Sequence, residues 1–413
     1  MGKRAITVGF CALMLAGGLT GVAPSQAAQT DSVMHEVQFA QFLTGAPGEV
    51  LAAFPERLVV HPGDTVHFSG HFGEEIPETG VHLVQLLPGG MSVDEWSQEE
   101  FLSPTGEWAT FATDPDEDPE EAPEAWKLNS RVVWPSHPYC GHSEEAPCDF
   151  DGSEGPLNGV LNSGVGLGLD SFLDFYVRIT AAPGTTIWAL CPFHPGIRIP
   201  IEVVDASEAL PPGQAAADSI AARMPRYNTQ AAALHANHVD KQVSVKGRGS
   251  SRIWEAWPGL ERGPIFLADM YPDKLVVRKG DSVRWHFPTN EIHTVTMPLE
   301  GASAITWLTA QCDLDTDQGS LDDAPAAPVP PFCAGGPLQY EGDLAHEFPF
   351  MIGDNEFTHA TDFANSGVRS PGYPGLPTAP YTLRFPSLSP TAGFTYVCLL
   401  HPSMRGTVVV GNG

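Results

Sequence analysis

The sequence predicts an all-β protein of two tandem domains, with long loop insertions and a partly helical linker. Glycine (42 residues) and proline (39 residues) are frequent, and only 17% of the 413 residues are charged. Long amphipathic helical patterns are rare, which favours short strands joined by turn-rich loops. An internal repeat relates the two halves of the chain and predicts that the domain is duplicated.

The repeat runs through three stretches of the chain. Residues 54–68 (FPERLVVHPGDTVHF) match residues 271–285 (YPDKLVVRKGDSVRW), 217 positions later. Within each copy, Leu-Val-Val, then Gly-Asp, then an alternating run predicts strand, turn and strand. Two shorter motifs repeat 211 and 207 positions later: His82-Leu-Val as His293-Thr-Val, and Cys191-Pro-Phe-His-Pro as Cys398-Leu-Leu-His-Pro.

These matches predict domain 1 at residues 33–205, a linker at 206–262 and domain 2 at 263–413. The linker opens on Pro-Pro-Gly, and its Ala-rich part, 214–238, is expected to form one or two helices. Each domain carries a Pro/Asp/Gly-rich insertion, at roughly 118–165 and 311–375, which we expect to be a loop with little regular structure.

Residues 1–28 are typical of an export signal peptide. Lys3 and Arg4 make a basic start, an apolar run follows, and Ser25-Gln26-Ala27 offers small residues for cleavage. Cys11 lies in the apolar run and is expected to be removed with the signal. No later stretch reaches the roughly 18 uninterrupted apolar residues of a membrane span. We therefore expect a secreted or periplasmic protein without a transmembrane segment.

The six remaining cysteines divide into two pairs and two single residues. An oxidising compartment allows disulfide bonds. Cys140–Cys148 and Cys312–Cys333 are the expected disulfides, because each pair lies within an insertion and the two pairs occupy equivalent places in the repeat. Cys191 and Cys398 are then left over, and both lie in metal-ligand contexts.

The second half holds His293 and, much later, Cys398-Leu-Leu-His401-Pro-Ser-Met404. Two imidazoles, a thiolate and a thioether match a type 1 (blue) copper site, in which His2Cys forms a plane and a Met is a long axial ligand. A cysteine at the end of one strand, followed by His and Met on a tight turn, lets one loop supply three of these ligands.

Cys-x-x-His-Pro-x-Met-Arg-Gly, followed by a β-type segment, resembles the amicyanin and plastocyanin family of cupredoxins. The resemblance covers each half once the insertions are excluded. It implies two tandem Greek-key cupredoxin β-sandwiches, with copper held by His293, Cys398, His401 and Met404. It also implies that the ring edge of His401 is the solvent-facing route for electrons. The alternative is a structural cysteine with two unrelated histidines.

The first half keeps His82, Cys191 and His194, but Ile197 stands at the axial position. Three equatorial ligands are enough for a second copper site in domain 1. The loss of a thioether donor destabilises Cu(II) relative to Cu(I) and is expected to raise the reduction potential. The alternative is a domain that has lost its metal and is kept for packing or partner recognition.

Other histidines and an acidic loop offer weaker metal sites. His235 and His238 would share one face of a helix, but structural histidines are the commoner case, as for His67, His71 and His286. Residues 313–317 (Asp313 to Asp317) imitate a calcium loop. Gly319 comes one position late, and no Glu closes the loop.

The predicted function is electron transfer by an exported blue copper protein between redox protein partners, without enzymatic activity. Oxidases and nitrite reductases of this fold need extra copper ligands, but neither Cys191 nor Cys398 has a histidine neighbour and no His-x-His pair occurs. The alternatives are a copper-binding module that docks a partner without redox turnover and, less favoured, a multicopper oxidase-like enzyme. A net charge of -29 argues against nucleic acid as a partner.

Overall fold

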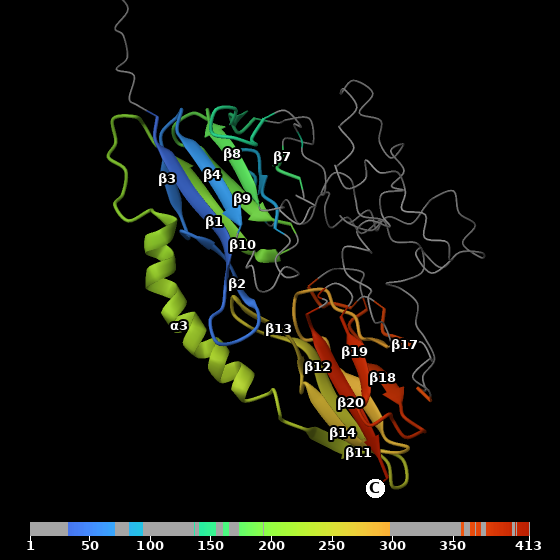
Figure 1. Cartoon of the computed structure of the whole chain (residues 1–413). Helices are drawn as coiled ribbons and strands as arrows, with labels where there is room; N and C mark the ends of the chain where they lie inside the picture. The colour runs from blue at the N-terminus through green and yellow to red at the C-terminus, as the bar shows by residue number, and fades with distance from the viewer. Residues whose placement is uncertain are drawn as a thin grey trace, which may run out of the picture. The chain divides into compact units, whose positions relative to one another are not determined.

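The computed structural model (Figure 1) describes residues 32–70, 82–93, 136, 140–153, 160–164, 173–192, 194–297, 357–358, 364–367, 369–372, 377–398, 401 and 403–412. All of them belong to one unit that starts at Ser32. The predicted signal peptide, the Cys312–Cys333 disulfide, the calcium loop and His71 lie outside the described residues. The described residues include no helix that is both long and apolar enough to cross a membrane.

The strands of the first half form two sheets that face each other across an apolar core. One sheet contains β1 (Met34–Phe42), β2 (Glu49–Phe54), β4 (Thr65–Gly70), β6 (Cys148–Phe150) and β8 (Asp174–Ile179). The other contains β3 (Leu58–Val60), β5 (Gln85–Leu86), β7 (Leu161–Asn162), β9 (Thr186–Cys191) and β10 (His194–Val203). In β4 the predicted alternation appears as buried Val66 and Phe68 between partly exposed neighbours.

The second half repeats this arrangement, except that β11 (Val243–Lys246) pairs with β12 (Arg252–Arg262) and no described strand takes the place of β6. Its first sheet contains β11, β12, β13 (Ile265–Tyr271), β15 (Ser282–Trp285) and β18 (Tyr381–Arg384). Its second contains β14 (Lys274–Arg278), β16 (Thr296–Met297), β17 (Ala364–Asn365), β19 (Phe394–Val397) and β20 (Arg405–Gly411). Both halves pair equivalent strands in parallel, β1 with β4 and β12 with β15. The predicted pair of tandem β-sandwiches is confirmed.

The first sheets of the two halves join edge to edge through β2 and β13. These strands are antiparallel, with Val50 opposite Ile265 and Glu49 opposite Phe266. Because β2 and β13 are equivalent strands of the repeat, the junction pairs like with like, as an isologous dimer interface does. At Gly48 (φ +127°) a Cβ would collide with the Phe266 carbonyl oxygen, so glycine permits the close approach.

One helix, α3 (Ala216–Ala236), covers the junction and confirms the helical part of the predicted linker. Its buried residues Met224, Tyr227 and Ala231 belong to one apolar cluster with residues of β2 and β13. Arg223 lies over the Phe54 ring, 4.5 Å from the centroid, and donates a hydrogen bond to the Ala53 carbonyl. The helix therefore packs on both halves at once.

The predicted linker and insertions contain more regular structure than the sequence patterns suggested. Residues 243–246 and 252–262 lie within the predicted linker, yet they form β11 and β12 of the second sandwich. The alignment of the repeat began at residue 54, after the first two strands of domain 1, so their equivalents before residue 271 were not found. The insertions contribute β6, β7 and β17 among the described residues. The other domain boundaries remain predictions.

Candidate metal centres

The first half brings His82, Cys191 and His194 together at one end of its sandwich. Cys191 ends β9 and His194 begins β10, so a tight turn supplies two of the three side chains. His82 precedes β5, which pairs with β9 through Gln85 and Leu190. All three residues are buried, and their ligand atoms lie within 4.8 Å of one another.

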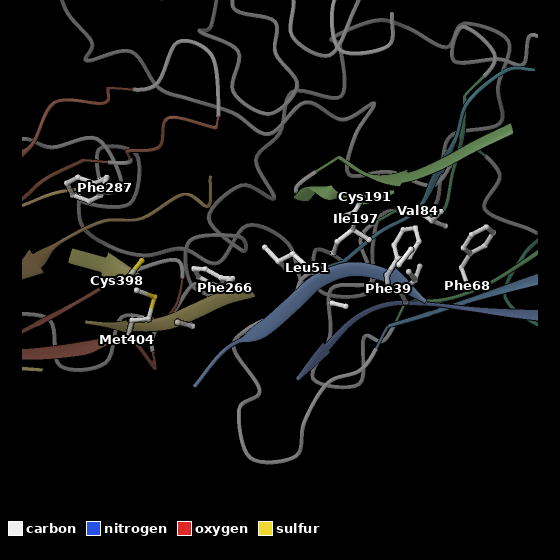
Figure 2. Close-up of a cluster of buried hydrophobic side chains, with 14 of the residues drawn as sticks. Phe39, Leu51, Phe68, Val84, Cys191, Ile197, Phe266, Phe287, Cys398 and Met404 are labelled. Atoms are coloured by element: carbon white, nitrogen blue, oxygen red, sulfur yellow. The ribbon is translucent and has the colours of Figure 1, made fainter. Parts of the chain in front are cut away.

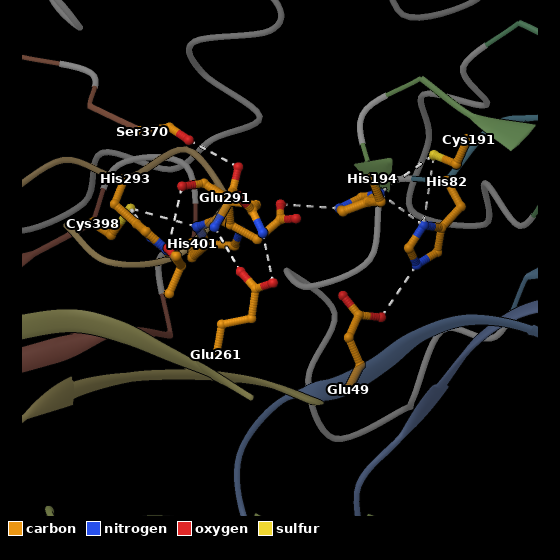
Figure 3. A network of polar contacts seen from close by, with 12 residues as sticks. Glu49, His82, Cys191, His194, Glu261, Glu291, His293, Ser370, Cys398 and His401 are labelled. Atoms are coloured by element: carbon orange, nitrogen blue, oxygen red, sulfur yellow. Dashed lines mark hydrogen bonds and ion pairs between the residues drawn. The ribbon is translucent and has the colours of Figure 1, made fainter. Parts of the chain in front are cut away.

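Both rings of this set point Nδ1 toward the thiol and Nε2 toward a carboxylate (Figure 3). The sulfur of Cys191 is 3.3 Å from His194 Nδ1 and 4.0 Å from His82 Nδ1, and the two Nδ1 atoms are 3.1 Å apart. His82 Nε2 lies 3.2 Å from Glu49, and His194 Nε2 lies 3.2 Å from Glu291 of the second half.

This geometry fits a metal ion. An ionised carboxylate only accepts hydrogen bonds, so Glu49 and Glu291 require the ring proton on each Nε2. The two Nδ1 lone pairs then face each other and the sulfur of Cys191 at one buried point. Lone pairs in such contact repel unless a cation lies between them. A thiolate with two imidazoles suits copper.

The charges of the first set support a thiolate. Burial alone would raise the pKa of Cys191, but the ring of His194 lowers the pKa to about 6. Burial alone would lower the pKa of His194, yet the carboxylate of Glu291 and the thiolate raise it well above its usual value. For His82, burial also acts downward, but Glu49 raises the pKa overall. Cys191 is therefore readily deprotonated, as a metal ligand must be.

The second half assembles His293, Cys398 and His401 in the same way. Cys398 follows β19, and its sulfur lies 3.8 Å from His293 Nδ1 and 3.5 Å from His401 Nδ1. The backbone N–H of Thr294 donates to this sulfur at 3.4 Å. Hydrogen bonds pair the backbone of Met404 with Cys398 (3.1 Å) and His401 (2.8 Å), so the turn holds Met404 beside both residues.

The surroundings of the second set are apolar. The His293 ring stacks on Phe266 with ring centroids 5.7 Å apart, and its buried Nε2 has no hydrogen-bond partner within the described part of the chain. Burial and the neighbouring ring of His401 lower the pKa of His293 well below its usual value. Burial and His194 lower the pKa of His401 to about 4. Both rings are neutral near pH 7 and free to act as ligands.

The two sets therefore differ in two places. Glu49 and Phe266 are opposite each other in the β2–β13 pair and 217 positions apart in the sequence, so they are equivalent in the repeat. Glu49 places a carboxylate beside His82, whereas Phe266 places an aromatic ring beside His293. At the axial position, fully buried Ile197 replaces fully buried Met404. Figure 2 shows Met404 beside Cys398 in the apolar core.

Sequence reasoning missed a serine that supports each set. Val84, two residues after His82, donates its N–H to Ser163 Oγ at 3.0 Å, and Val295, two residues after His293, donates to Ser366 Oγ at 2.8 Å. Each serine thereby fixes the backbone that follows a ligand histidine. The signal was present, because Asn-Ser-Gly at 162–164 recurs at 365–367, 203 positions later.

Glu49 and Glu291 were also missed, and no sequence pattern marked them. Glu291 reaches His194 across the contact between the two halves. Glu49 is in the half that holds His82, but it precedes the aligned part of the repeat. Their role follows only from the three-dimensional arrangement of the two sandwiches.

Four other histidines that the structure describes are bonded to protein groups. His235 Nδ1 lies 3.0 Å from the Tyr271 hydroxyl, and His238 Nδ1 lies 2.8 Å from a backbone carbonyl. His67 pairs with Asp174 and His286 with Glu255. Within the described ranges, the potential metal-binding groups are the two His-Cys-His sets. The structural interpretation of these other histidines agrees with the contacts.

The cysteines follow the predicted division as far as the structure describes them. Cys140 and Cys148 form a disulfide bond, which confirms one of the two predicted pairs. Cys191 and Cys398 are buried and take no part in a disulfide bond. The disulfide anchors the start of β6, where Cys148 pairs with Val177 of β8.

Two β-sandwiches, each with a buried His-Cys-His set at the turn between its last two strands, show a tandem cupredoxin fold with donor sets that suit copper. No family model and no curated protein matches the sequence. The fold resembles a blue copper oxidase from Nitrosomonas europaea, with 10% identity over 64% of each chain and a TM-score of 0.17. The chain thus spans just under two thirds of that protein.

Two further solved structures are similar at the same low level. A copper-containing nitrite reductase from Thermus scotoductus shows 9% identity over 92% of this chain and 68% of its own, with a TM-score of 0.20. A multi-copper oxidase from Pediococcus acidilactici shows 10% identity over 63% and 42%, with a TM-score of 0.16. The prediction that the chain is not an enzyme is corrected here, because all three of these similar structures are of an oxidase or a reductase.

Proposed function

We propose that this copper redox protein carries single electrons between redox partners through a type 1 site in each half. The observation that carries the proposal is the pair of buried sets, each with one cysteine sulfur and two histidine Nδ1 atoms at one point. Copper bound there supplies a one-electron couple between Cu(I) and Cu(II).

The residues around each site hold the ligands in place and exclude water. His82, Cys191, His194, His293 and Cys398 are all buried, and each cysteine lies at a strand end fixed by the sheet. We assign Met404 as the axial ligand of the second site. His401 as a whole residue is partly exposed, unlike His293 and Cys398, and we propose its ring edge as the point where electrons enter or leave.

We also propose that the protein works outside the cytoplasm, secreted or in a periplasm. The basic and apolar start of the sequence supports export. The Cys140–Cys148 disulfide supports an oxidising compartment. The partners would be redox proteins.

Copper stoichiometry and an absorption spectrum of the purified protein test the proposal. Cys191→Ser and Cys398→Ser should each leave one copper and one thiolate-to-Cu(II) band, and the double variant should lose the band. A band that survives in the double variant would contradict the assignment. Redox titration then separates a carrier, with a reversible midpoint, from a binding module that does not respond to reductants.

Copper-dependent catalysis is the second candidate, because the similar structures include a copper oxidase and a copper-containing nitrite reductase. Oxygen uptake with phenols tests an oxidase, and consumption of nitrite with a reduced dye tests a reductase. The Cys191→Ser, Cys398→Ser double variant is the matched control, because an activity that uses these sites should disappear with them.

A further inference from the structure

Two carboxylates are buried beside the first set, close to the junction of the two halves. Glu49 is 2% exposed and Glu291 is 3% exposed. Burying a charged carboxylate costs several kcal/mol unless polar groups compensate for the lost water. Each carboxylate contacts one imidazole nitrogen, and Glu291 Oε1 is buried without a hydrogen-bond partner in the described ranges. Packing or folding stability does not account for two such groups.

The position of Glu291 is fixed by its own half. The neighbouring residue, Asn290, donates its backbone N–H to Glu261 of β12 at 2.6 Å and its side-chain amide at 2.7 Å (Figure 3). Ser370 donates to the Asn290 carbonyl at 2.8 Å. Glu291 is also two residues before His293. A loop built on the second sandwich therefore presents a carboxylate to the first site.

Among the described residues, no such carboxylate contacts His293 of the second site. Its Nε2 faces Gly259, where an added Cβ would lie 2.9 Å away, and the ring stacks on Phe266. Since Phe266 is the repeat equivalent of Glu49, the two sites differ at this position by a substitution within a duplicated domain. Of the two sets, the first is thus the one whose imidazole Nε2 atoms contact carboxylates among the described residues.

We propose that Glu49 and Glu291 are positioning residues of the first copper site, and that the second half completes this site by supplying Glu291. The inference rests on the proposed function, because it concerns copper at the first set. Each carboxylate keeps the proton on Nε2 of a histidine, directs Nδ1 to the metal, and makes the imidazole a stronger donor.

A direction of effect follows from charge. A nearby negative charge stabilises Cu(II) more than Cu(I), because Cu(II) carries one more positive charge. Glu49 and Glu291 therefore lower the reduction potential of the first site. This effect opposes that of Ile197, whose missing thioether raises the potential. The axial residue alone does not determine which site holds the electron more tightly.

The test uses the full chain in a Cys398→Ser background, where only the first site holds copper. Glu49→Gln and Glu291→Gln keep the side-chain shape and an acceptor oxygen but remove the charge. Each should weaken Cu(II) binding about 10- to 100-fold, with a smaller effect on Cu(I). A tenfold greater loss for Cu(II) corresponds to a rise of about 59 mV in potential.

Two controls separate this role from a structural one. Glu255→Gln removes another buried carboxylate that contacts a histidine, His286, outside both sets, and should leave the first-site potential unchanged. In a Cys191→Ser background, Glu291→Gln should shift the potential of the second site much less than it shifts the potential of the first site in the Cys398→Ser background. A second site that still holds copper also shows that the Glu291→Gln variant folds.

The outcomes are distinct. The Cys398→Ser parent could show the first-site band while neither Gln variant changes the copper affinity or the potential more than Glu255→Gln does. That result overturns this inference and leaves the proposed function standing. Absence of copper from that parent overturns both. A rise in potential confined to the first site supports the positioning role.

Discussion

At the scale of single residues, the equivalent histidines His82 and His293 differ in pKa because one neighbouring residue differs between the two halves. Burial lowers the pKa of His82 and of His293 alike, because it disfavours the charged ring. Glu49 then reverses the shift for His82, whereas Phe266 gives His293 no compensation. The same duplicated ligand therefore lies in an acidic environment in one half and in an apolar one in the other.

Gly259 should be required for the second site. Its backbone is left-handed (φ +72°), and an added Cβ would lie 2.9 Å from His293 Nε2. Gly259→Ala should displace the ring, so that copper content or the visible band of the second site falls, measured in a Cys191→Ser background. Gly263→Ala is the matched control, because that glycine is also left-handed (φ +61°) but has nothing within 4 Å of the added Cβ.

The outcome separates contact from backbone strain. A left-handed alanine costs about 1–2 kcal/mol at either position. If both variants affected the second site equally, displacement of His293 would be excluded as the cause. If Gly259→Ala alone reduced copper binding, the close approach to the ring would be the reason.

The axial position should tune the two sites in opposite directions. Met404→Leu should keep a blue centre and raise its potential, because the thioether donor is lost. Ile197→Met should add a donor to the first site and lower its potential. Redox titrations in the Cys191→Ser and Cys398→Ser backgrounds measure each site alone. Unchanged potentials in both variants would show that these buried side chains do not reach the metal.

At the scale of elements, the Gly-Asp turn of each copy ties an equivalent strand, β1 or β12, to the sheet. Asp64 accepts hydrogen bonds from the backbone of Val33 (3.0 Å) and His61 (2.9 Å), and its carboxylate contacts His35. Asp281 does the same with the backbone of Arg252 (2.7 Å) and with Trp254 Nε1 (2.9 Å). The repeated Asp is thus a structural residue of the fold.

Asp64→Asn should lower the free energy of unfolding by about 1–3 kcal/mol at pH 7, as loss of charge-assisted hydrogen bonds does. Burial alone would raise the pKa of this carboxyl, but hydrogen bonds from His35, His61 and Val33 lower it below 3.8. A depressed folded-state pKa contributes stability that is present above pH 3.8 and lost as the pH falls through the folded value. Denaturant titrations from pH 7 to about pH 3 measure it.

The expected difference between parent and variant therefore narrows below pH 3.8. Asp174→Asn serves as the control, because Asp174 contacts His67 on the surface and should change stability by less than about 1 kcal/mol. A difference between the parent and the Asp64→Asn variant that stayed constant down to about pH 3 would contradict the assigned role of the ionised carboxyl.

The sequence predicted those elements in which local pattern and repeat agree. The Leu-Val-Val and Gly-Asp motifs gave β3, β4, β14 and β15 together with the turns between them, because alternation and turn residues act locally. β12 was assigned to the linker, since its pairing with β13 and β15 depends on strands outside the aligned segment. The cysteine and second histidine of each set were predicted to lie together, because Cys-x-x-His places both on one turn; their role as copper ligands stays a prediction.

At the scale of the whole molecule, the two sandwiches are one structure. β2 and β13 join their first sheets, α3 packs on both strands, and one buried apolar cluster contains Cys191 and Cys398 as well as Phe266 between the halves (Figure 2). This junction could not be predicted from sequence. The repeat shows that the halves are alike, but it does not say which edges meet, and Glu291 depends on that contact.

The continuous sheet and core predict that copper at one site stabilises both halves. A ligand that binds only the folded chain stabilises it by about 2.7 kcal/mol at 100 times its dissociation constant. Such stabilisation spreads to every strand that opens only in global unfolding. In Cys191→Ser, where only the second site can hold copper, loading should slow amide hydrogen exchange in β4 and β8 of the first half. Exchange in β4 and β8 should slow by the same factor as exchange in β19 and β20. The expected factor is about 100-fold when copper is at 100 times its dissociation constant.

Hydrogen exchange followed by mass spectrometry of peptides from each half measures this effect, with the copper-free protein as reference. The Cys191→Ser, Cys398→Ser double variant controls for copper bound elsewhere and should show no change on addition of the metal. Protection that rose only in the second half would mean that the β2–β13 junction opens independently. In that case the two sandwiches would unfold separately, because the hydrogen bonds and apolar contacts across the junction would be weaker than those within either half.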